Sequence, residues 1–344
     1  MSLSKTTQAL LSLLLLFMLL ALPFLVSSGA VTQEALYHYE DALYGEDDLA
    51  KDITFAAPSS AIATIASSGM TDVVFSKQIT SLPVDTSPGK TPIKANYTDT
   101  GYVDDTIAVE MEQLRMFESD VFVARVRIAT PSQLRTAYAG NKMNSTRTNH
   151  TSRLATNYNG IAAINGDYYP KTRAGYIVRQ GEVYREKTSE NMDLLLIDEL
   201  GDFHIIPKGH NLQKEAVENF REEHQLINGF FFGPGLIIGG EEQEIPKNYQ
   251  FDPNSPNPRA AIGQTGPLSY VLVVVNGRTE ASRGVTMKEL GSVMKEIGCL
   301  EAYNLDGGNS ATLSFNNQVY NDKPQAERSV TDIIYFASAT NQSE

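Results

Sequence analysis

Short apolar segments separated by polar turns dominate the chain from about residue 106 onwards. Residues 106–116 and 121–129 are rich in β-branched side chains, and the second stretch nearly alternates apolar and polar positions. Further short apolar segments follow at 160–164, 175–178, 194–197, 236–238, 270–275, 302–305, 311–315 and 333–336. Segments of this length between turns are typical of strands. The pattern predicts an α+β fold: a strand-rich mixed sheet domain with a few packed helices.

One helix is indicated with both of its ends. Thr286 and Glu289 have the spacing of a capping box, in which each side chain accepts a backbone N–H of the other residue. Apolar residues recur at helical spacing from 287 to 297, and Gly298 can end the helix. The order strand 270–276, helix 286–298, strand 301–305 predicts a right-handed crossover between two parallel, neighbouring strands.

The N-terminus carries a targeting signal. Residues 9–26 are apolar except for Ser12 and follow Lys5. At 1.5 Å per residue the run spans about 27 Å, which suffices for a bilayer core and exceeds the usual apolar region of a signal peptide. Small residues at 28–30 would suit cleavage. We expect an N-terminal membrane anchor or a signal peptide within 1–30, with the anchor favoured, and an extracytoplasmic protein in either case.

The composition of the chain then changes twice before residue 106. Residues 31–60 contain seven acidic residues against one lysine, and prolines interrupt 77–105. These features predict an acidic stalk and linker over 31–105, with residues 31–100 dispensable for chemistry, and a catalytic domain over 106–338.

Composition narrows the classes of partner. The net charge of −13 argues against nucleic-acid binding, because an acidic surface repels phosphate backbones. The single cysteine, Cys299, excludes an intrachain disulfide and a Cys/His zinc framework. An exported domain with one cysteine suggests a bacterial source.

Polar residues follow apolar strands in four stretches, where open sheets usually bind ligands. In the first, Asn165, Asp167 and Tyr168 follow the strand 160–164, although a plain hairpin with Asp167 capping a backbone N–H fits equally well. In the second, Pro258 restricts the backbone before Arg259, so that the Arg259 side chain is held in place to bind an anion. A structural salt bridge is the alternative interpretation of Arg259.

The other two stretches add cations and a glycine turn. Arg278 and Arg283 precede the N-terminus of the predicted helix, which also favours anions, although a solvated loop explains Arg283 equally well. In the fourth stretch two glycines follow Asp306, so that backbone N–H groups can approach a ligand. An Asp-capped glycine turn is the alternative there, but the crowding of polar groups favours a site. These groups belong to Asn304, Asp306, Asn309 and Ser310, and the two glycines are Gly307 and Gly308.

These four blocks in this order, together with Glu182 in 181–183 and Arg328 in 328–330, resemble the phosphodiester glycosidase family over about residues 106–338. The resemblance implies hydrolysis of a sugar-1-phosphodiester at the glycosidic carbon, with possible roles in cell-wall or exopolysaccharide metabolism. Asn309 stands where the family has a third glycine; asparagine tolerates left-handed geometry, so we expect the turn to survive.

The chemistry of such a reaction suggests roles for these residues. A phosphate ester leaves as a stable anion and needs a cation to hold it, for which Arg259 and Arg278 are suited. One carboxylate must activate water or stabilise the oxocarbenium-like carbon, and Asp306 is the first choice and Asp167 the second. These two carboxylates are expected to lie close together.

The remaining residues are assigned to substrate binding. Asn165, Asn304 and Ser310 would bind sugar hydroxyls, and Tyr168 would stack on the ring. Glu182, Gly307, Gly308 and Arg328 complete the set. No cofactor is firmly implied, and a divalent cation near Asp167 and Asp306 stays open.

Two other functions fit the same residues. The chain could be an ordinary exported glycoside hydrolase that uses Asp167 and Asp306 as a pair, or a non-catalytic wall-glycan binding module. In each case the partners are a glycan and, through the N-terminal segment, a membrane.

Overall fold

The computed structural model describes residue 75 and residues 84–140, 142–143, 145 and 147–340. The predicted anchor or signal peptide over 1–30, and most of the predicted stalk, lie outside these residues. Among the residues described, no helix has both the length and the apolar character needed to cross a membrane.

The strands form three sheets, and all the strand pairs described in them are antiparallel. The large sheet has the order β1 (Tyr97–Thr98), β2 (Gly101–Val103), β3 (Ile107–Met116), β4 (Ser119–Ile128), β15 (Ser269–Val275), β14 (Arg259–Gly266), β16 (Glu301–Leu305), β12 (Gly235–Ile238) and β13 (Glu241–Glu242). The second sheet has the order β10 (Phe203–Ile206), β9 (Leu194–Ile197), β11 (Asn228–Phe230), β7 (Gly175–Arg179) and β8 (Glu182–Lys187). The third has the order β18 (Gln318–Val319), β17 (Leu313–Phe315), β6 (Ala162–Asn165), β19 (Asp332–Phe336) and β5 (Leu134–Tyr138).

The helices described are α3 (Thr151–Asn157), α4 (His210–Glu223) and α5 (Met287–Ile297). Single turns of 3-10 helix occur at η2 (Lys94–Asn96), η3 (Pro131–Gln133), η4 (Tyr169–Lys171) and η5 (Gly308–Ser310). The α+β, strand-rich class predicted from the sequence is confirmed.

The predicted mixed sheet is wrong. β15 and β16 do run in the same direction, but they are not neighbours, because β14 lies between them and is antiparallel to both. β14 and β15 form a hairpin with a short turn, so β14 takes the position next to β15 before the chain crosses over through α5. The crossover therefore skips one strand of the large sheet.

The helix of this crossover begins and ends as predicted. The Thr286 hydroxyl accepts the Glu289 N–H at 3.2 Å, and Glu289 accepts the Thr286 N–H at 2.8 Å. Gly298 ends the helix in the left-handed region, with φ of 94°. Local sequence signals are sufficient here because both caps involve residues within one helical turn.

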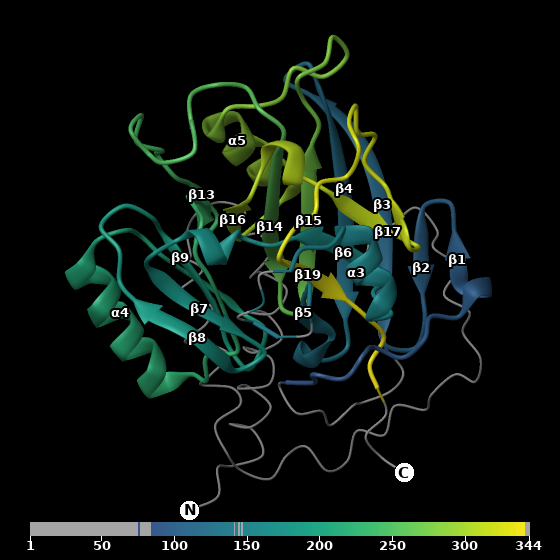
Figure 1. The fold of residues 1–344 in the computed structure, drawn as a ribbon, viewed down its shortest axis with the longest axis horizontal. Coiled ribbons are helices and arrows are strands. Elements are labelled where there is room, and N and C mark those ends of the chain that lie inside the picture. Colours follow the sequence, from purple (N-terminus) through teal and green to yellow (C-terminus); the bar gives the residue numbers. More distant parts are fainter. Residues whose placement is uncertain (1–74, 76–83, 141, 144, 146, 341–344) are drawn as a thin grey trace, which may run out of the picture. The chain divides into compact units, whose positions relative to one another are not determined.

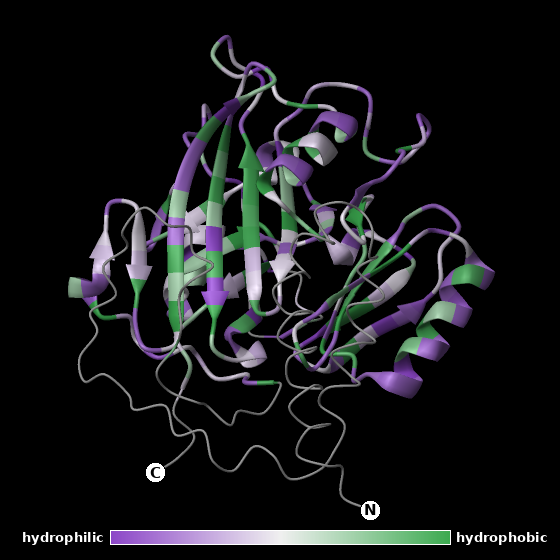
Figure 2. Ribbon diagram, turned by 180° about the vertical axis from the view of Figure 1, so that it is seen from behind, coloured by the Kyte–Doolittle hydropathy of each residue, from purple (hydrophilic) through white to green (hydrophobic). Residues whose placement is uncertain are grey.

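One hydrophobic core is shared by the inner faces of all three sheets. It joins residues such as Leu272 of β15, Leu195 of β9 and Ile334 of β19. Each helix covers an outer face: α5 packs on the large sheet, α4 on the second and α3 on the third (Figure 1). Figure 2 shows that the central strands are largely hydrophobic, whereas many loops at their ends are hydrophilic. The polar chemistry is therefore gathered at strand ends.

The folded body begins before residue 106. Tyr102 in β2 is 1% exposed, and Lys90 forms a bridge with Ser338 near the end of the described chain. The buried Arg135 guanidinium lies 2.7 Å from the Asp85 carboxylate. Parts of the segment 85–105, for which the sequence predicted a linker, therefore pack on the domain.

The Asp85–Arg135 ion pair gives a test of this boundary. Asp85→Ala leaves the Arg135 guanidinium buried without its carboxylate, which costs about 3–5 kcal/mol. We expect the melting temperature to fall by on the order of 10 °C. Glu218→Ala, which removes an exposed pair with Lys214, is the matched control and should change stability by less than about 1 kcal/mol. Equal melting temperatures for the two variants would show that residue 85 does not belong to the folded body.

Candidate active site

The ends of strands from all three sheets meet at one place. Asn165 ends β6, Asp332 begins β19, Arg179 ends β7, and Asp306 directly follows β16. The predicted polar stretch at 163–169 is not a hairpin, because β6 pairs with β17 and β19 and neither strand follows it directly in the chain.

Asn165 joins the loop after β6 to the loop after β16. Its side-chain amide donates to the carbonyls of Asp306 at 2.7 Å and of Gly166 at 3.1 Å, and its oxygen accepts the Thr312 N–H at 3.1 Å. The Asp306 N–H in turn donates to the Gly166 carbonyl at 3.3 Å. The loops that carry Asp167 and Asp306 therefore lie side by side, and the charge of Asp167 acts on the Asp306 carboxyl group, as expected if the two carboxylates are close together. Asn165 is 1% exposed and contacts backbone, so its binding of sugar hydroxyls stays a prediction.

A buried arginine lies between two aspartates behind this junction. Arg179 Nη2 is 2.7 Å from Asp167 Oδ1 and 3.0 Å from Asp332 Oδ2, and all three side chains are almost completely buried. Nη1 donates to the Gly229 carbonyl, and the guanidinium carbon lies 4.0 Å from the centre of the Phe230 ring. Burial alone would lower the pKa of Arg179, but the two carboxylates raise it above its ordinary value. The cation is therefore permanent.

Asp167 uses both of its carboxylate oxygens inside the protein. Besides Arg179, Oδ1 accepts the Tyr169 N–H at 3.2 Å, and Oδ2 accepts the Phe231 N–H at 2.7 Å. The side chain is completely buried. These contacts suit a positioning residue, and its direct role in catalysis stays a prediction.

Asp332 lies against the loop after β6. A side chain at Gly166 would bring Cβ within 2.4 Å of the Asp332 carboxylate, so only glycine leaves room for it. Burial raises the pKa of Asp332 and the charge of Asp167 raises it further, while Arg179 opposes both effects. Asp332 is the second carboxylate that borders the hollow described next.

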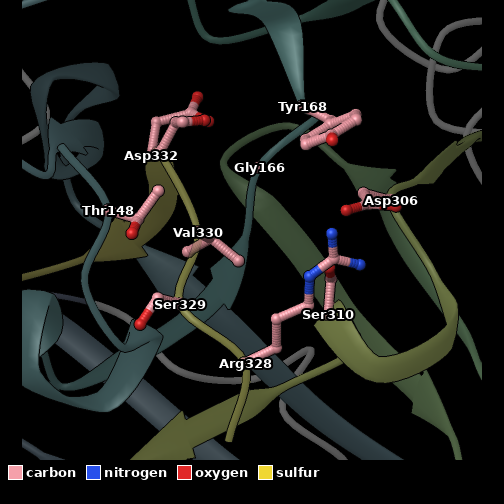
Figure 3. A pocket seen from close by; sticks show the side chains of 10 residues that line it. Thr148, Gly166, Tyr168, Asp306, Ser310, Arg328, Ser329, Val330 and Asp332 are labelled. Atoms are coloured by element: carbon pink, nitrogen blue, oxygen red, sulfur yellow. The ribbon is translucent and has the colours of Figure 1, made fainter. Parts of the chain in front are cut away.

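A small hollow opens at the junction and is bordered by two carboxyl groups and a guanidinium. Its lining residues are Thr148, Gly166, Tyr168, Asp306, Ser310, Arg328, Ser329, Val330, Thr331 and Asp332. In Figure 3 the Arg328 guanidinium points toward Asp306 and Ser310, and the Tyr168 ring lies near Asp306. The guanidinium carbon of Arg328 is 5.8 Å from the centre of the Tyr168 ring. Tyr168 has a left-handed backbone, with φ of 62°, at the start of η4.

The environment of Asp306 raises the pKa of its carboxyl group. Burial raises the pKa of its carboxyl group, and the charge of Asp167 acts in the same direction. A hydrogen bond from Ser310 and the positive charge of Arg328 act the other way without cancelling the rise. A raised pKa in a hollow is a property of many catalytic carboxyl groups, since it places the group closer to the working pH.

A second hollow, with a volume of about 140 Å³, borders the same loop at Gly308 and Asn309. It is lined by two cations. The exposed Arg278 donates to the Asn257 oxygen at 2.9 Å and to the Asn309 oxygen at 3.2 Å. Lys323 donates to the Ala311 carbonyl at 2.6 Å, and burial lowers its pKa to about 8. Arg278 is thus placed beside the Asp306 loop, although its binding of substrate stays a prediction.

Arg259 occupies a different position from the one expected of a phosphate ligand. It is 4% exposed and lines neither hollow. Its guanidinium donates to four backbone carbonyls, those of Phe251, Asp252, Ser255 and Val285, at 2.7–3.3 Å. Its donors are therefore directed to the 251–255 loop and to the segment before α5.

The remaining predicted residues are placed outside the first hollow. Asn304 is fully buried and donates to the Gly233 carbonyl at 2.7 Å. Glu182 is exposed on β8, at the position that pairs with Arg179. Gly307 packs against Pro258, and the Gly308 N–H donates to the Pro258 carbonyl at 2.8 Å. Their contacts with substrate stay predictions.

Sequence reasoning missed four residues of this region: Thr148, Arg179, Lys323 and Asp332. Two of them could have been found from the sequence, because Arg179 directly follows the apolar segment 175–178 and Asp332 directly precedes the apolar segment 333–336. A charged residue at the end of a buried strand must be paired, but its partner comes from another sheet.

A divalent cation fits poorly between Asp167 and Asp332, because the Arg179 guanidinium already supplies the positive charge there. Asp306 lies next to Arg328, which provides a positive charge in the hollow itself. The positive charge at this site is therefore supplied by arginine side chains.

Comparison with solved structures gives matches at low sequence identity. The catalytic domain of zebrafish N-acetylglucosamine-1-phosphodiester alpha-N-acetylglucosaminidase, auto-inhibited by its pro-peptide, matches with a TM-score of 0.54 at 16% identity. That match covers 75% of this chain and 97% of the zebrafish domain. A hypothetical protein from Synechocystis matches with a TM-score of 0.48 at 15% identity, over 67% of this chain and 62% of the other.

Similarity in sequence points the same way. The SPbeta prophage-derived uncharacterized protein YomE of Bacillus subtilis (strain 168) is 32% identical over 108 residues, which are 31% of this chain and 17% of that protein. A family model described as phosphodiester glycosidase matches residues 158–337, more than half of the chain. That range includes the buried Asp167–Arg179–Asp332 group, Asp306 and Arg328, and the chain belongs to the phosphodiester glycosidase family.

Proposed function

We propose that the chain hydrolyses the glycosidic bond of sugar-1-phosphodiesters and releases a sugar and a phosphomonoester. The observation that carries this proposal is the pairing of Asp306, whose pKa is raised, with the Arg328 guanidinium in one hollow. Membership of the family supports the same reaction class.

The leaving group decides which residues the reaction needs. An ordinary glycosidase must protonate an alcohol as it departs, whereas a phosphomonoester departs as a stable anion. Arg328 would hold that anion as its charge grows, since a guanidinium matches phosphate oxygens with two parallel hydrogen bonds. Arg328 would thus share the phosphate-holding role that the sequence suggested for Arg259 and Arg278.

Asp306 would then act on the sugar side of the bond. In its ionised form it can accept a proton from water that attacks the anomeric carbon, and a raised pKa makes it a stronger base. The Tyr168 ring would pack against the sugar, while Asp167 and Arg179 keep the junction in place. Arg278 and Lys323 in the second hollow would contact the part of a larger substrate that leaves together with the phosphate.

The location of this activity is a separate proposal. The apolar run at 9–26 supports export across a membrane, with the catalytic domain held outside the cell or secreted. A glycan or glycolipid bearing a phosphodiester in the cell envelope would then be the accessible substrate class.

Asp306→Asn tests the proposed base. The amide keeps the size and a hydrogen-bonding oxygen but cannot accept the proton from water, so kcat on a sugar-1-phosphodiester should fall by roughly 10²–10⁴. Asp99→Asn, at an exposed position in the turn between β1 and β2, is the matched control and should retain full activity. Unchanged kcat for Asp306→Asn would remove Asp306 from the reaction.

The pH dependence of kcat/KM tests whether Asp306 acts as a base or as an acid. A base must be ionised, so kcat/KM should rise with pH and level off above the pKa of Asp306. Because burial raises that pKa, the midpoint should lie above the ordinary aspartate value of about 3.9. A limb in which activity falls with rising pH, and which disappears in Asp306→Asn, would make Asp306 an acid instead.

Arg328→Met tests whether the leaving group is a phosphate. We expect kcat/KM on a sugar-1-phosphodiester to fall by about 10², while hydrolysis of an uncharged nitrophenyl glycoside, if present, stays the same. Arg221→Met, on the outer helix α4, is the control for loss of one surface guanidinium. Equal losses on both substrates would favour an ordinary glycoside hydrolase, and binding of glycans without turnover by the unmodified chain would favour a binding module.

Arg259→Lys separates a structural role from a substrate-binding role. A lysine cannot reach all four carbonyls, so the loss of charge-assisted hydrogen bonds should cost about 2 kcal/mol or more and lower the melting temperature by several degrees. Melting temperature and kcat are measured on the same protein. A stable variant with a selective loss of kcat would restore Arg259 to the substrate-binding residues.

A further inference from the structure

A cluster of two histidines and one aspartate lies in the second sheet, away from the hollows. Asp198 directly follows β9, His204 lies in β10, and His224 caps the C-terminus of α4. One ligand atom from each residue lies within 4.8 Å of the other two. β10 is one edge strand of this sheet, and three strands separate it from β8 at the other edge.

Asp198 is held so that one oxygen faces both imidazoles. Its side chain is 1% exposed, and Oδ1 accepts the N–H groups of Leu200 at 2.9 Å and of Asp202 at 2.8 Å. Oδ2 lies 2.9 Å from His204 Nε2 and 3.3 Å from His224 Nδ1. Fixing one oxygen by backbone donors is how outer contacts orient a metal-binding carboxylate.

His224 provides an independent sign that a group is to be bound here. Its Nδ1 is buried and makes no hydrogen bond to any residue that the structure describes, although it faces the Asp198 carboxylate. A buried polar atom that makes no hydrogen bond is costly, and a cation between the ring and the carboxylate, now 3.3 Å apart, would satisfy both groups.

Further carboxyl groups surround the cluster. Glu199 Oε1 lies 3.9 Å from His224 Nδ1. The carboxyl groups of Asp202 and Glu301 are close enough to interact electrostatically with His204. Three neighbouring carboxyl groups around a two-histidine, one-aspartate set favour a divalent cation over an anionic ligand.

We propose that Asp198, His204 and His224 bind one Zn²⁺ ion, with a water molecule or, after rotation of its side chain, Glu199 as the fourth ligand. Bonds of about 2.0–2.2 Å in a tetrahedral site place ligand atoms roughly 3.3 Å apart, and the present separations require only small side-chain shifts. Two imidazoles and carboxylates suit Zn²⁺ better than Ca²⁺ or Mg²⁺, which prefer oxygen ligands throughout.

The ion would be structural. It would strengthen the connection between the turn that joins β9 to β10 and the end of α4, where the Gln225 N–H already donates to Glu199 at 2.7 Å and the rings of His204, Phe220 and His224 are in contact. A metal bound only by the folded chain raises the stability of that chain. The site is independent of Asp306 and Arg328, so failure of one proposal leaves the other standing.

Zinc titration of the full chain, stripped of metal by a chelator, tests the proposal. Calorimetry should give one site per chain, Co²⁺ should give the visible absorption of a tetrahedral complex, and Zn²⁺ should raise the melting temperature while Ca²⁺ should not. His204→Ala and His224→Ala should each weaken Zn²⁺ binding roughly 100-fold. His210→Ala, at the first turn of the same helix α4, is the matched control and should bind like the unmodified chain.

Asp198→Asn covers the case in which a histidine variant fails to fold. The asparagine keeps the oxygen that accepts the two backbone N–H groups but loses the anionic oxygen. The variant should therefore fold, and it should bind Zn²⁺ more weakly than the unmodified chain does. No Zn²⁺ binding by the unmodified chain, binding by Asp198→Asn equal to that of the unmodified chain, or an equal loss in His210→Ala would each overturn the proposal.

Discussion

The Arg179 guanidinium, buried between Asp167 and Asp332, is the contact on which the junction of the sheets depends. Arg179 belongs to the second sheet, whereas the two aspartates belong to the β6 and β19 ends of the third. A buried guanidinium without its carboxylates would cost several kcal/mol, so the two sheets must meet in this register. Because Gly166 and Asp306 hydrogen-bond across the same place, the β16 end of the large sheet is aligned as well.

The three-sheet architecture explains why chemistry is found at this junction. The inner faces of the sheets share one apolar core, and a helix covers each outer face, so the faces offer little room for polar side chains. Strand ends from three sheets converge where that core stops. Side chains that are far apart in the chain, such as Asp306 and Arg328, can there border a common hollow while their backbones stay in rigid elements.

Burial separates the cations of this region into two kinds. Arg259 is almost fully buried and its donors are directed to backbone carbonyls, so its charge orders a loop. Arg328 is exposed, and its charge acts on the carboxyl group of Asp306. A basic residue can hold a substrate phosphate only if its donors are free of such internal contacts, and this is a property of tertiary packing that residue type alone does not reveal.

The amino-acid sequence by itself determined the features that depend on neighbours in the chain. Most strands, the α5 helix with its Thr286–Glu289 cap, and the loops that carry Asp167 and Asp306 were predictable, since apolar periodicity, caps and glycine turns act over a few residues. Only the tertiary structure decided that β14 separates β15 from β16, that parts of the segment 85–105 pack on the domain, and that Arg328 rather than Arg259 faces Asp306. The same holds for the partners of Arg179 and for the Asp198–His204–His224 cluster. Each of these rests on contacts between segments distant in sequence, and such contacts are set by which surfaces the core brings together.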